Sequence, residues 1–213
     1  MRNGVRADFI RSYMFPPGLL DRFSIHHPDL SLKDRQLVAH ALRQFFIAYL
    51  KSGRKFVSMP SQVADDLWHE FILYTRHYDS FCQHAFGSFM HHTPAVALGT
   101  DKQNNTGLRR TWWYCCLEEN INPKKATRLP LLFSLDNKLN IRNGFSYVLD
   151  CNGVKRQGTQ ENSGAIYCGG DISSSSLNGG LDGFGDSSSI FGDGSTGGDG
   201  GGGCGGGCGG GGD

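Results

Sequence analysis

The chain lacks the long apolar run that a transmembrane helix needs, and no apolar segment followed by small residues stands near Met1. Without these features, the sequence predicts no membrane span and no secretory leader. Residues 1–15 are mildly basic and amphipathic, but Asp8 and the brevity of the stretch disfavour a targeting peptide. We therefore expect a cytoplasmic protein.

Several catalytic motifs are also missing. The chain has no phosphate-binding loop and no nucleophile elbow. His69-Glu70 resembles the start of a zincin HExxH motif, but Leu73 stands where the second histidine is needed. The sequence thus disfavours a zincin and leaves open whether the protein is an enzyme at all.

Basic residues are absent from the last quarter of the chain. Residues 1–156 hold all 21 Lys and Arg against 13 acids, whereas residues 157–213 hold seven acids. The basic excess of the first part is scattered rather than clustered, which disfavours nucleic-acid binding. The acidic end predicts either an attraction to the basic part or simply two regions of different composition.

Glycine is scarce before residue 157, with eight of the 31, and then dominates. Glycine and serine runs bury too little apolar surface to offset the entropy lost on ordering them. We therefore divide the chain into an N-terminal segment (1–15), a helical domain (16–150) and a disordered, flexible Gly/Ser/Asp/Cys-rich tail (151–213).

Seven cysteines, an odd number, argue against a complete disulfide framework. The neighbours Cys115 and Cys116 are expected to be small buried hydrophobic residues. Near the end, Cys204 and Cys208 are separated only by glycine. With two more ligands, for which Cys151 and Cys168 are candidates, they would suit zinc, but unstructured thiols are the simpler interpretation.

The stretch 60–94 has the clearest helical signal in the chain, and it carries five of the eight histidines. Ser61 is a good N-cap, and Gly87 suits the left-handed conformation that often ends a helix. Apolar residues recur at steps of three or four between them: Val63, Leu67, Phe71, Tyr74, Tyr78, Phe81 and Ala85. The pattern predicts one long packed helix over about 61–85.

Weaker patterns predict the remaining elements. A short helix is expected over 18–25, and a helix opened by Ser31 and Asp34 should end at Gly53. A third main helix is expected around 108–117, with Trp112 in the core and Trp113 at its rim. The sequence therefore predicts an all-α fold, a small bundle of three to four main helices, with a short C-terminal hairpin turning at Asn143-Gly144 and ending at Val148.

One candidate site lies on and after the long helix. His69 projects to the flank of the apolar stripe, with Asp65 four and Asp66 three residues before it, so either carboxylate can reach its ring. If the chain doubles back after Gly87, His91 or His92 would approach His69. Two histidines and a carboxylate bind zinc or non-haem iron. The ligand set is then His69, His91 or His92, and Asp66, against the simpler interpretation that His69 is a packing or hydrogen-bonding residue. His77 and His84 are expected on the solvated surface.

The chain resembles the glycine-rich domain-containing protein-like family. The resemblance is carried by MPSQVADDLWHEFILYTRHYDSFCQHAFGSFMHHTP, by LPLLFSLD and by the Gly-Cys tail. It implies a Trp-His helical domain with a Gly/Cys-rich C-terminal tail and no particular reaction. Phe71 stands where plant relatives carry a second histidine, which weighs against a metal there. The resemblance singles out the signature residues Asp66, Trp68, His69, Tyr78, Cys82, His91 and His92.

Three functional hypotheses remain at this point. The first is a non-enzymatic interaction or scaffold module whose flexible acidic tail meets a protein partner or membrane-associated machinery. The second is a metal-binding protein or metal-dependent enzyme, for instance a hydrolase or oxygenase, using His69 with His91 or His92 and Asp66. The third is a thiol sensor that uses Cys82 or the tail cysteines.

Overall fold

A computed structural model describes residues 3–92, 106–149 and 166–168. Within these ranges the protein is helical, and the predicted all-α fold is confirmed. The predicted number of main helices, three to four, is too low, because the described residues form seven. They are α1 (Asn3–Ser12), α2 (Leu19–His26), α3 (Leu32–Lys51), α4 (Gln62–Leu73), α5 (Thr75–Ala85), α6 (Thr106–Glu118) and α7 (Leu131–Lys138).

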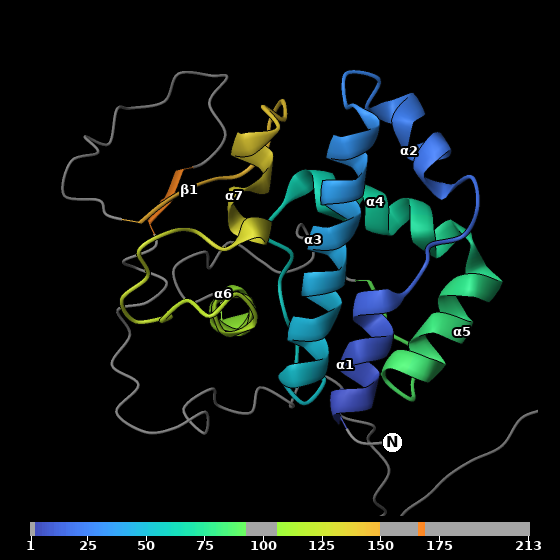
Figure 1. Ribbon diagram of the computed structural model, residues 1–213, viewed down its shortest axis with the longest axis horizontal. Helices are drawn as coiled ribbons and strands as arrows, with labels where there is room; N and C mark the ends of the chain where they lie inside the picture. The colour runs from blue at the N-terminus through green and yellow to red at the C-terminus, as the bar shows by residue number, and fades with distance from the viewer. Residues whose placement is uncertain (1–2, 93–105, 150–165, 169–213) are drawn as a thin grey trace, which may run out of the picture. The chain divides into compact units, whose positions relative to one another are not determined.

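The longest helix, α3, lies between the other helices and packs against α1, α4, α6 and α7 (Figure 1). Its start is fixed by the predicted capping box, in which the Ser31 hydroxyl accepts from Asp34 N–H and the Asp34 carboxylate accepts from Ser31 N–H. It ends just before Gly53, which has a φ of 74°. Phe45 and Phe46, both buried, place two aromatic rings at the centre of the core.

The predicted helix over 61–85 is wrong in one respect, because it is interrupted at Tyr74. Tyr74 has φ −81° and ψ 57°, outside the helical region, and its N–H bonds to Phe71 O. The apolar spacing runs unbroken across this residue, so the sequence carries no sign of the break. Tertiary packing explains it: the turn lets Phe71 and Phe81, from either side of the break, both contact the ring of Phe46.

A buried carboxylate anchors the start of α4. Asp136 on α7 accepts from the Ser61 hydroxyl at 2.6 Å and from the N–H groups of Gln62 (2.7 Å), Val63 (3.3 Å) and Phe145 (2.9 Å). Ser61 in turn caps α4 by accepting from Ala64 N–H, as predicted. Asp136 therefore accepts from donors that a helix N-terminus leaves unpaired, and its negative charge is stabilised by the positive end of the helix dipole.

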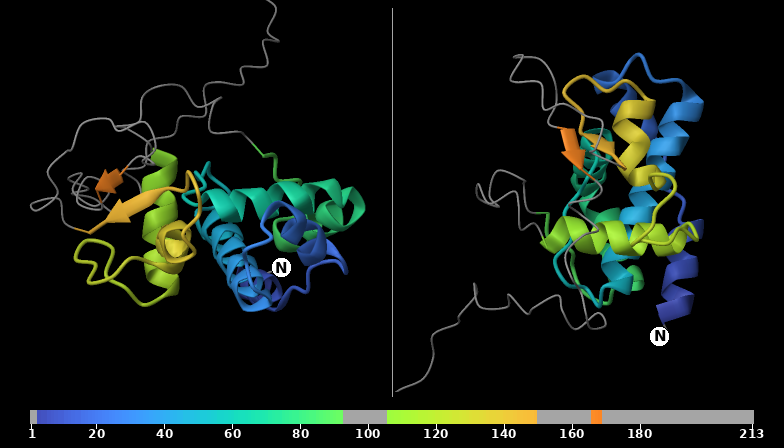
Figure 2. Two further views of the ribbon diagram at one scale, coloured as in Figure 1. Left: turned by 90° about the horizontal axis from the view of Figure 1, so that it is seen from above. Right: turned by 90° about the vertical axis from the view of Figure 1, so that its left-hand side faces the viewer.

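Helix α6 runs across α3 (Figure 2). Trp112 is buried and Trp113 half-buried, which confirms the predicted core and rim positions. Cys115 and Cys116 are buried free thiols, also as predicted. Gly107 lets α6 pack closely against the segment that follows α3, since a Cβ at residue 107 would lie 2.5 Å from Ser58 Oγ.

The predicted C-terminal hairpin is wrong. Strand β1 (Ser146–Val148) pairs in parallel with β2 (Ile166–Cys168), and parallel strands cannot be joined by a tight turn. Helix α7 ends at Lys138, and residues 139–142, directly before Asn143, form no strand. Because β2 lies beyond residue 150, the predicted boundary between domain and tail passes through a strand pair. The rest of the predicted flexible tail, with Cys151, Cys204 and Cys208, lies outside the described residues.

The N-terminal segment that the sequence sets apart contributes to the helical core through residues 3–15. Helix α1 packs against α3 and α5 and buries Ala7 and Ile10. Its Arg11 contacts Glu118 of α6, which also binds Lys51 of α3. Across the described ranges, no helix combines the length and apolar character that crossing a membrane requires.

Candidate functional site

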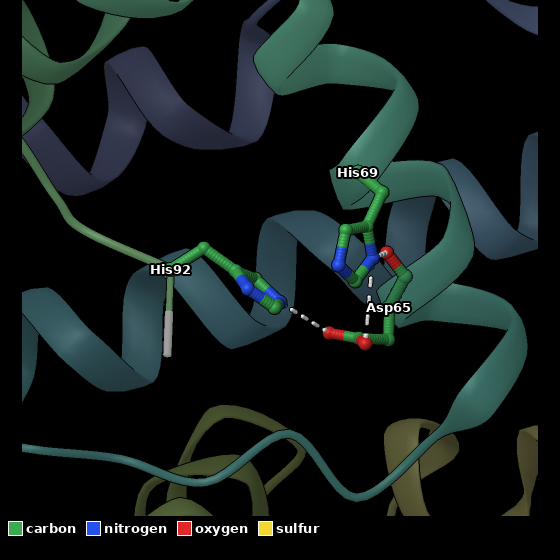
Figure 3. Close-up of side chains that lie close together, drawn as sticks. All are labelled: Asp65, His69 and His92. Atoms are coloured by element: carbon green, nitrogen blue, oxygen red, sulfur yellow. Dashed lines mark hydrogen bonds and ion pairs between the residues drawn. The ribbon is translucent and has the colours of Figure 1, made fainter. Parts of the chain in front are cut away.

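Asp65, His69 and His92 lie together on the polar side of α4, where they form the D-H-H cluster (Figure 3). Asp65 and His69 are one turn apart on α4, and His92 lies seven residues beyond the end of α5. The break at Tyr74 reverses the chain, so that the segment after α5 returns to α4. One ligand atom from each residue can be chosen so that all three lie within 4.8 Å of one another.

Asp65 is the centre of the cluster. Its Oδ1 lies 3.0 Å from Nε2 of His92, and its Oδ2 lies 3.4 Å from Nδ1 of His69. The two imidazole rings are 4.1 Å apart between centroids. One carboxylate therefore meets two histidines through different oxygens, an arrangement that holds both rings near a common point.

The tautomer of His69 follows from its hydrogen bond. Its Nδ1 lies 2.8 Å from the backbone carbonyl of Asp65, which can only accept, so Nδ1 carries the proton when the ring is neutral. The lone pair is then on Nε2. The His69 side chain is 52% exposed, against 11% for His92, so the cluster has one open and one shielded imidazole.

Asp66, the carboxylate named as a ligand from the sequence, is not part of this cluster. It accepts from Gln62 Nε2 at 2.9 Å and lies 2.9 Å from Nε2 of His27, the residue after α2. The His27 side chain is only 17% exposed, although it follows directly after the end of α2. Asp66 thus links α4 to α2, while Asp65 links α4 to the segment after α5.

The two histidines of the 91–92 doublet separate. His92 joins Asp65 and His69, whereas His91 is exposed and its ring contacts Phe89 at 5.0 Å between centroids. His77 and His84 are exposed, as predicted. Only one member of the doublet, His92, therefore faces α4.

The signature residues Trp68, Tyr78 and Cys82 are all buried, and Trp68 contacts His92 of the D-H-H cluster. Burial raises the pKa of the Cys82 thiol, against the opposing effect of hydrogen bonds with the Met90 backbone and Tyr78. Burial likewise raises the pKa of the Tyr78 hydroxyl, so that it stays protonated. Burial and the raised pKa together predict a slowly reacting thiol at Cys82, which weighs against its use as a sensor.

A second pairing was missed at the sequence level. Glu70, buried on α4, binds Arg22 Nε at 3.0 Å and lies 3.4 Å from His26 Nε2, both on α2. The available signal was the acidic face of α4, where Asp66 and Glu70 are one turn apart and oppose the His26-His27 doublet. Spacing within one helix cannot show which of two histidine doublets meets which carboxylate.

A family model described as UCP032817-like matches residues 5–172. The chain belongs to the UCP032817-like family. The match covers α2 to α7, both strands and most of α1, and it contains the whole D-H-H cluster. The match ends at residue 172, before Cys204 and Cys208 of this UCP032817-like protein. No curated protein and no solved structure shows a significant similarity to the chain.

Proposed function

We propose that this protein binds a divalent transition-metal ion through Asp65, His69 and His92. The observation that supports the proposal is the convergence of two imidazoles and one carboxylate from two separate segments within 4.8 Å. This donor set suits zinc, and the same set leaves open positions on non-haem Fe(II).

The distances are consistent with a bound ion. Ligand atoms around a tetrahedral zinc lie roughly 3.3 Å apart, given zinc–ligand bonds of roughly 2.0–2.1 Å. The 3.0 Å between Asp65 Oδ1 and His92 Nε2 is already close to this value. His69 can offer its unprotonated Nε2 to the ion while its Nδ1–H keeps the hydrogen bond to the Asp65 carbonyl.

Three protein ligands would leave at least one position for water or a substrate. A metal-bound water loses its proton far more easily than bulk water, which is the basis of zinc hydrolases, and an open Fe(II) site can bind oxygen. The exposed His69 is on the side from which a small molecule would enter. We therefore propose a metal site with one accessible coordination position, at which the reaction is either a hydrolysis or an oxygenation.

Metal analysis of the untagged full-length protein tests this proposal. We expect zinc or iron close to one ion per chain in the wild type. Each of His69→Ala, His92→Ala and Asp65→Asn should weaken affinity by more than roughly 100-fold, because losing even an outer partner of a metal ligand costs roughly 10- to 100-fold.

The neighbouring residues provide matched controls. Asp66→Asn and His91→Ala change the same residue types one position away, outside the cluster, and should keep the metal. A metal-free, folded wild type that also fails to bind added zinc or Fe(II) would contradict the proposal. So would equal losses in the control and ligand variants.

The other sequence-based hypotheses stay predictions. An interaction or scaffold module with a protein partner depends on the acidic tail, nearly all of which lies outside the described residues. Cytoplasmic location and the resemblance to the glycine-rich domain-containing protein-like family are likewise predictions, since neither is tested by the fold or by the family match.

A further inference from the structure

The segment that carries His92 is fixed to the helices by a buried chain of hydrogen bonds. The Tyr78 hydroxyl donates to the backbone carbonyl of Met90 at 2.6 Å. The same hydroxyl accepts from the indole Nε1–H of Trp68 at 3.1 Å. All three residues are at most 4% exposed, so these bonds form away from water, where an unmet polar group is costly.

The peptide at Met90 is held from α5 at two points. While Tyr78 binds its carbonyl, the Met90 backbone also hydrogen-bonds Cys82, one helical turn after Tyr78. The chain two residues before His92 therefore has little freedom to shift along α5.

The ring of His92 is oriented by a second contact. It meets the indole of Trp68 at 4.4 Å between centroids and 68° between planes, an edge-to-face geometry that aromatic rings favour. With the ring in this position, its Nε2 points at Asp65. Trp68 therefore contacts both residues: its indole ring packs against the ring of His92, and its Nε1–H donates to the Tyr78 hydroxyl.

Trp68 and His69 are adjacent on α4 and have different tasks. Trp68 is buried against Phe45 and Phe46 of α3, while His69 faces solvent. The rigid contact with α3 makes Trp68 a fixed surface for His92, one residue away from the other histidine of the cluster.

We propose that Tyr78 and Trp68 are positioning residues for His92, which set the place and orientation of its imidazole before any ion binds. This inference deepens the proposed function and rests on it for the effect on metal affinity. The advantage is preorganisation: a ligand held in its bound geometry loses less entropy when the ion arrives.

Tyr78→Phe in the full-length protein isolates the hydroxyl. The substitution keeps the buried ring and removes both the donor to Met90 and the acceptor for Trp68. We expect zinc affinity to fall about 10-fold, the lower end of the effect of losing an outer partner of a ligand. Tyr114→Phe, which changes a buried tyrosine of α6 remote from the cluster, should leave zinc affinity unchanged.

A double-mutant cycle separates positioning from a general loss of structure. If Tyr78 acts through His92, Tyr78→Phe should have no further effect on zinc affinity in a His92→Ala background and its full effect in a His69→Ala background. An equal loss in the His92→Ala background would overturn the proposal.

A measurement on the metal-free protein makes failure of this inference distinct from failure of the metal proposal. We expect NMR cross-peaks between the imidazole protons of His92 and the indole of Trp68, and we expect Tyr78→Phe to weaken them. If they persist unchanged, the positioning role is wrong even where zinc binds. If they weaken and the wild type binds no metal, the positioning role stands and the metal function falls. Should Tyr78→Phe not fold, Trp68→Phe removes the N–H donor and replaces it in the zinc titrations and in the double-mutant cycle.

Discussion

Asp65 and Asp66 are adjacent carboxylates with different partners. Asp65 is four residues before His69 and faces His92, whereas Asp66 turns toward His27. Both carboxylates have a spacing that can reach His69, so the sequence could predict that this histidine pairs with a carboxylate of its own helix. It could not choose between them, because the choice depends on which segments pack on either side of α4.

At the same scale, the cysteines of the helical part should resist thiol reagents. Burial raises the pKa of Cys115 well above its ordinary value and that of Cys116 to about 12, and Cys82 is shifted in the same direction. Only the thiolate reacts, so at pH 8 these three should be labelled slowly in the folded protein and fully in urea. Mass-spectrometric mapping of iodoacetamide adducts measures this, and labelling of Cys115 at the same rate in both states would contradict it.

At the scale of elements, α4 depends on a residue of another helix. Asp136→Ala removes the acceptor for four buried or half-buried donors at the start of α4 and beside Phe145. We expect a loss of about 3 kcal/mol in the free energy of unfolding, because unpaired buried donors cost roughly 1–3 kcal/mol each and some will regain water. Urea denaturation measures the loss. Asp79→Ala, an exposed change on α5, should stay within roughly 0.5 kcal/mol of the wild type.

The contact of α1 with α6 should respond to pH. Burial alone would raise the pKa of Glu118, but hydrogen bonds from Arg11 and Lys51 outweigh it and hold the pKa below its ordinary value of 4.5. Glu118 therefore adds stability above pH 4.5, and this contribution disappears as the pH falls through the lower value of the folded state.

Glu118→Gln should accordingly cost about 1 kcal/mol at pH 7, discounted for the partial exposure of Arg11. The difference in unfolding free energy from the wild type should shrink toward zero in acid. Denaturation at a series of pH values measures it. A difference that grows below pH 4 would mean that the carboxylate is not the stabilising partner.

The elements show where local patterns suffice. Ser31 with Asp34 predicted the start of α3, and Ser61 predicted the start of α4, since capping is decided by residues within one turn. The break at Tyr74 is different. Neither glycine nor proline marks it, and it forms because Phe71 and Phe81 both contact α3, so a reader of the sequence extends the helix through it.

At the scale of the whole molecule, the proposed metal site and the tail cysteines are separable. The ligands lie on α4 and just after α5, and the family match ends at residue 172. A chain ending at residue 178, six residues after the family match, should bind zinc with unchanged stoichiometry and affinity. Calorimetric titration of both chains measures this. Loss of the ion on truncation would assign Cys204 and Cys208 as ligands instead.

The all-helical class of the molecule was accessible from periodicity, whereas the pairing of β1 with β2 was not. Three-residue strands have too little pattern to detect, and the partner of Ser146–Val148 follows a long intervening stretch. Composition placed residues 166–168 in a glycine-rich region, where a short apolar triplet still suffices for backbone pairing.

The chain reversal at Tyr74 has an energetic consequence for the proposed site. Asp65 and His69 precede the reversal and His92 follows it. An ion held by all three would therefore tie α4 to the segment after α5, so that α5 could not separate from α4 unless the ion dissociated. Each tenfold rise in free ion concentration above the Kd should raise the free energy of this opening by about 1.4 kcal/mol. Amide exchange in Thr75–Ala85 would then report occupancy from a helix that supplies none of the ligands.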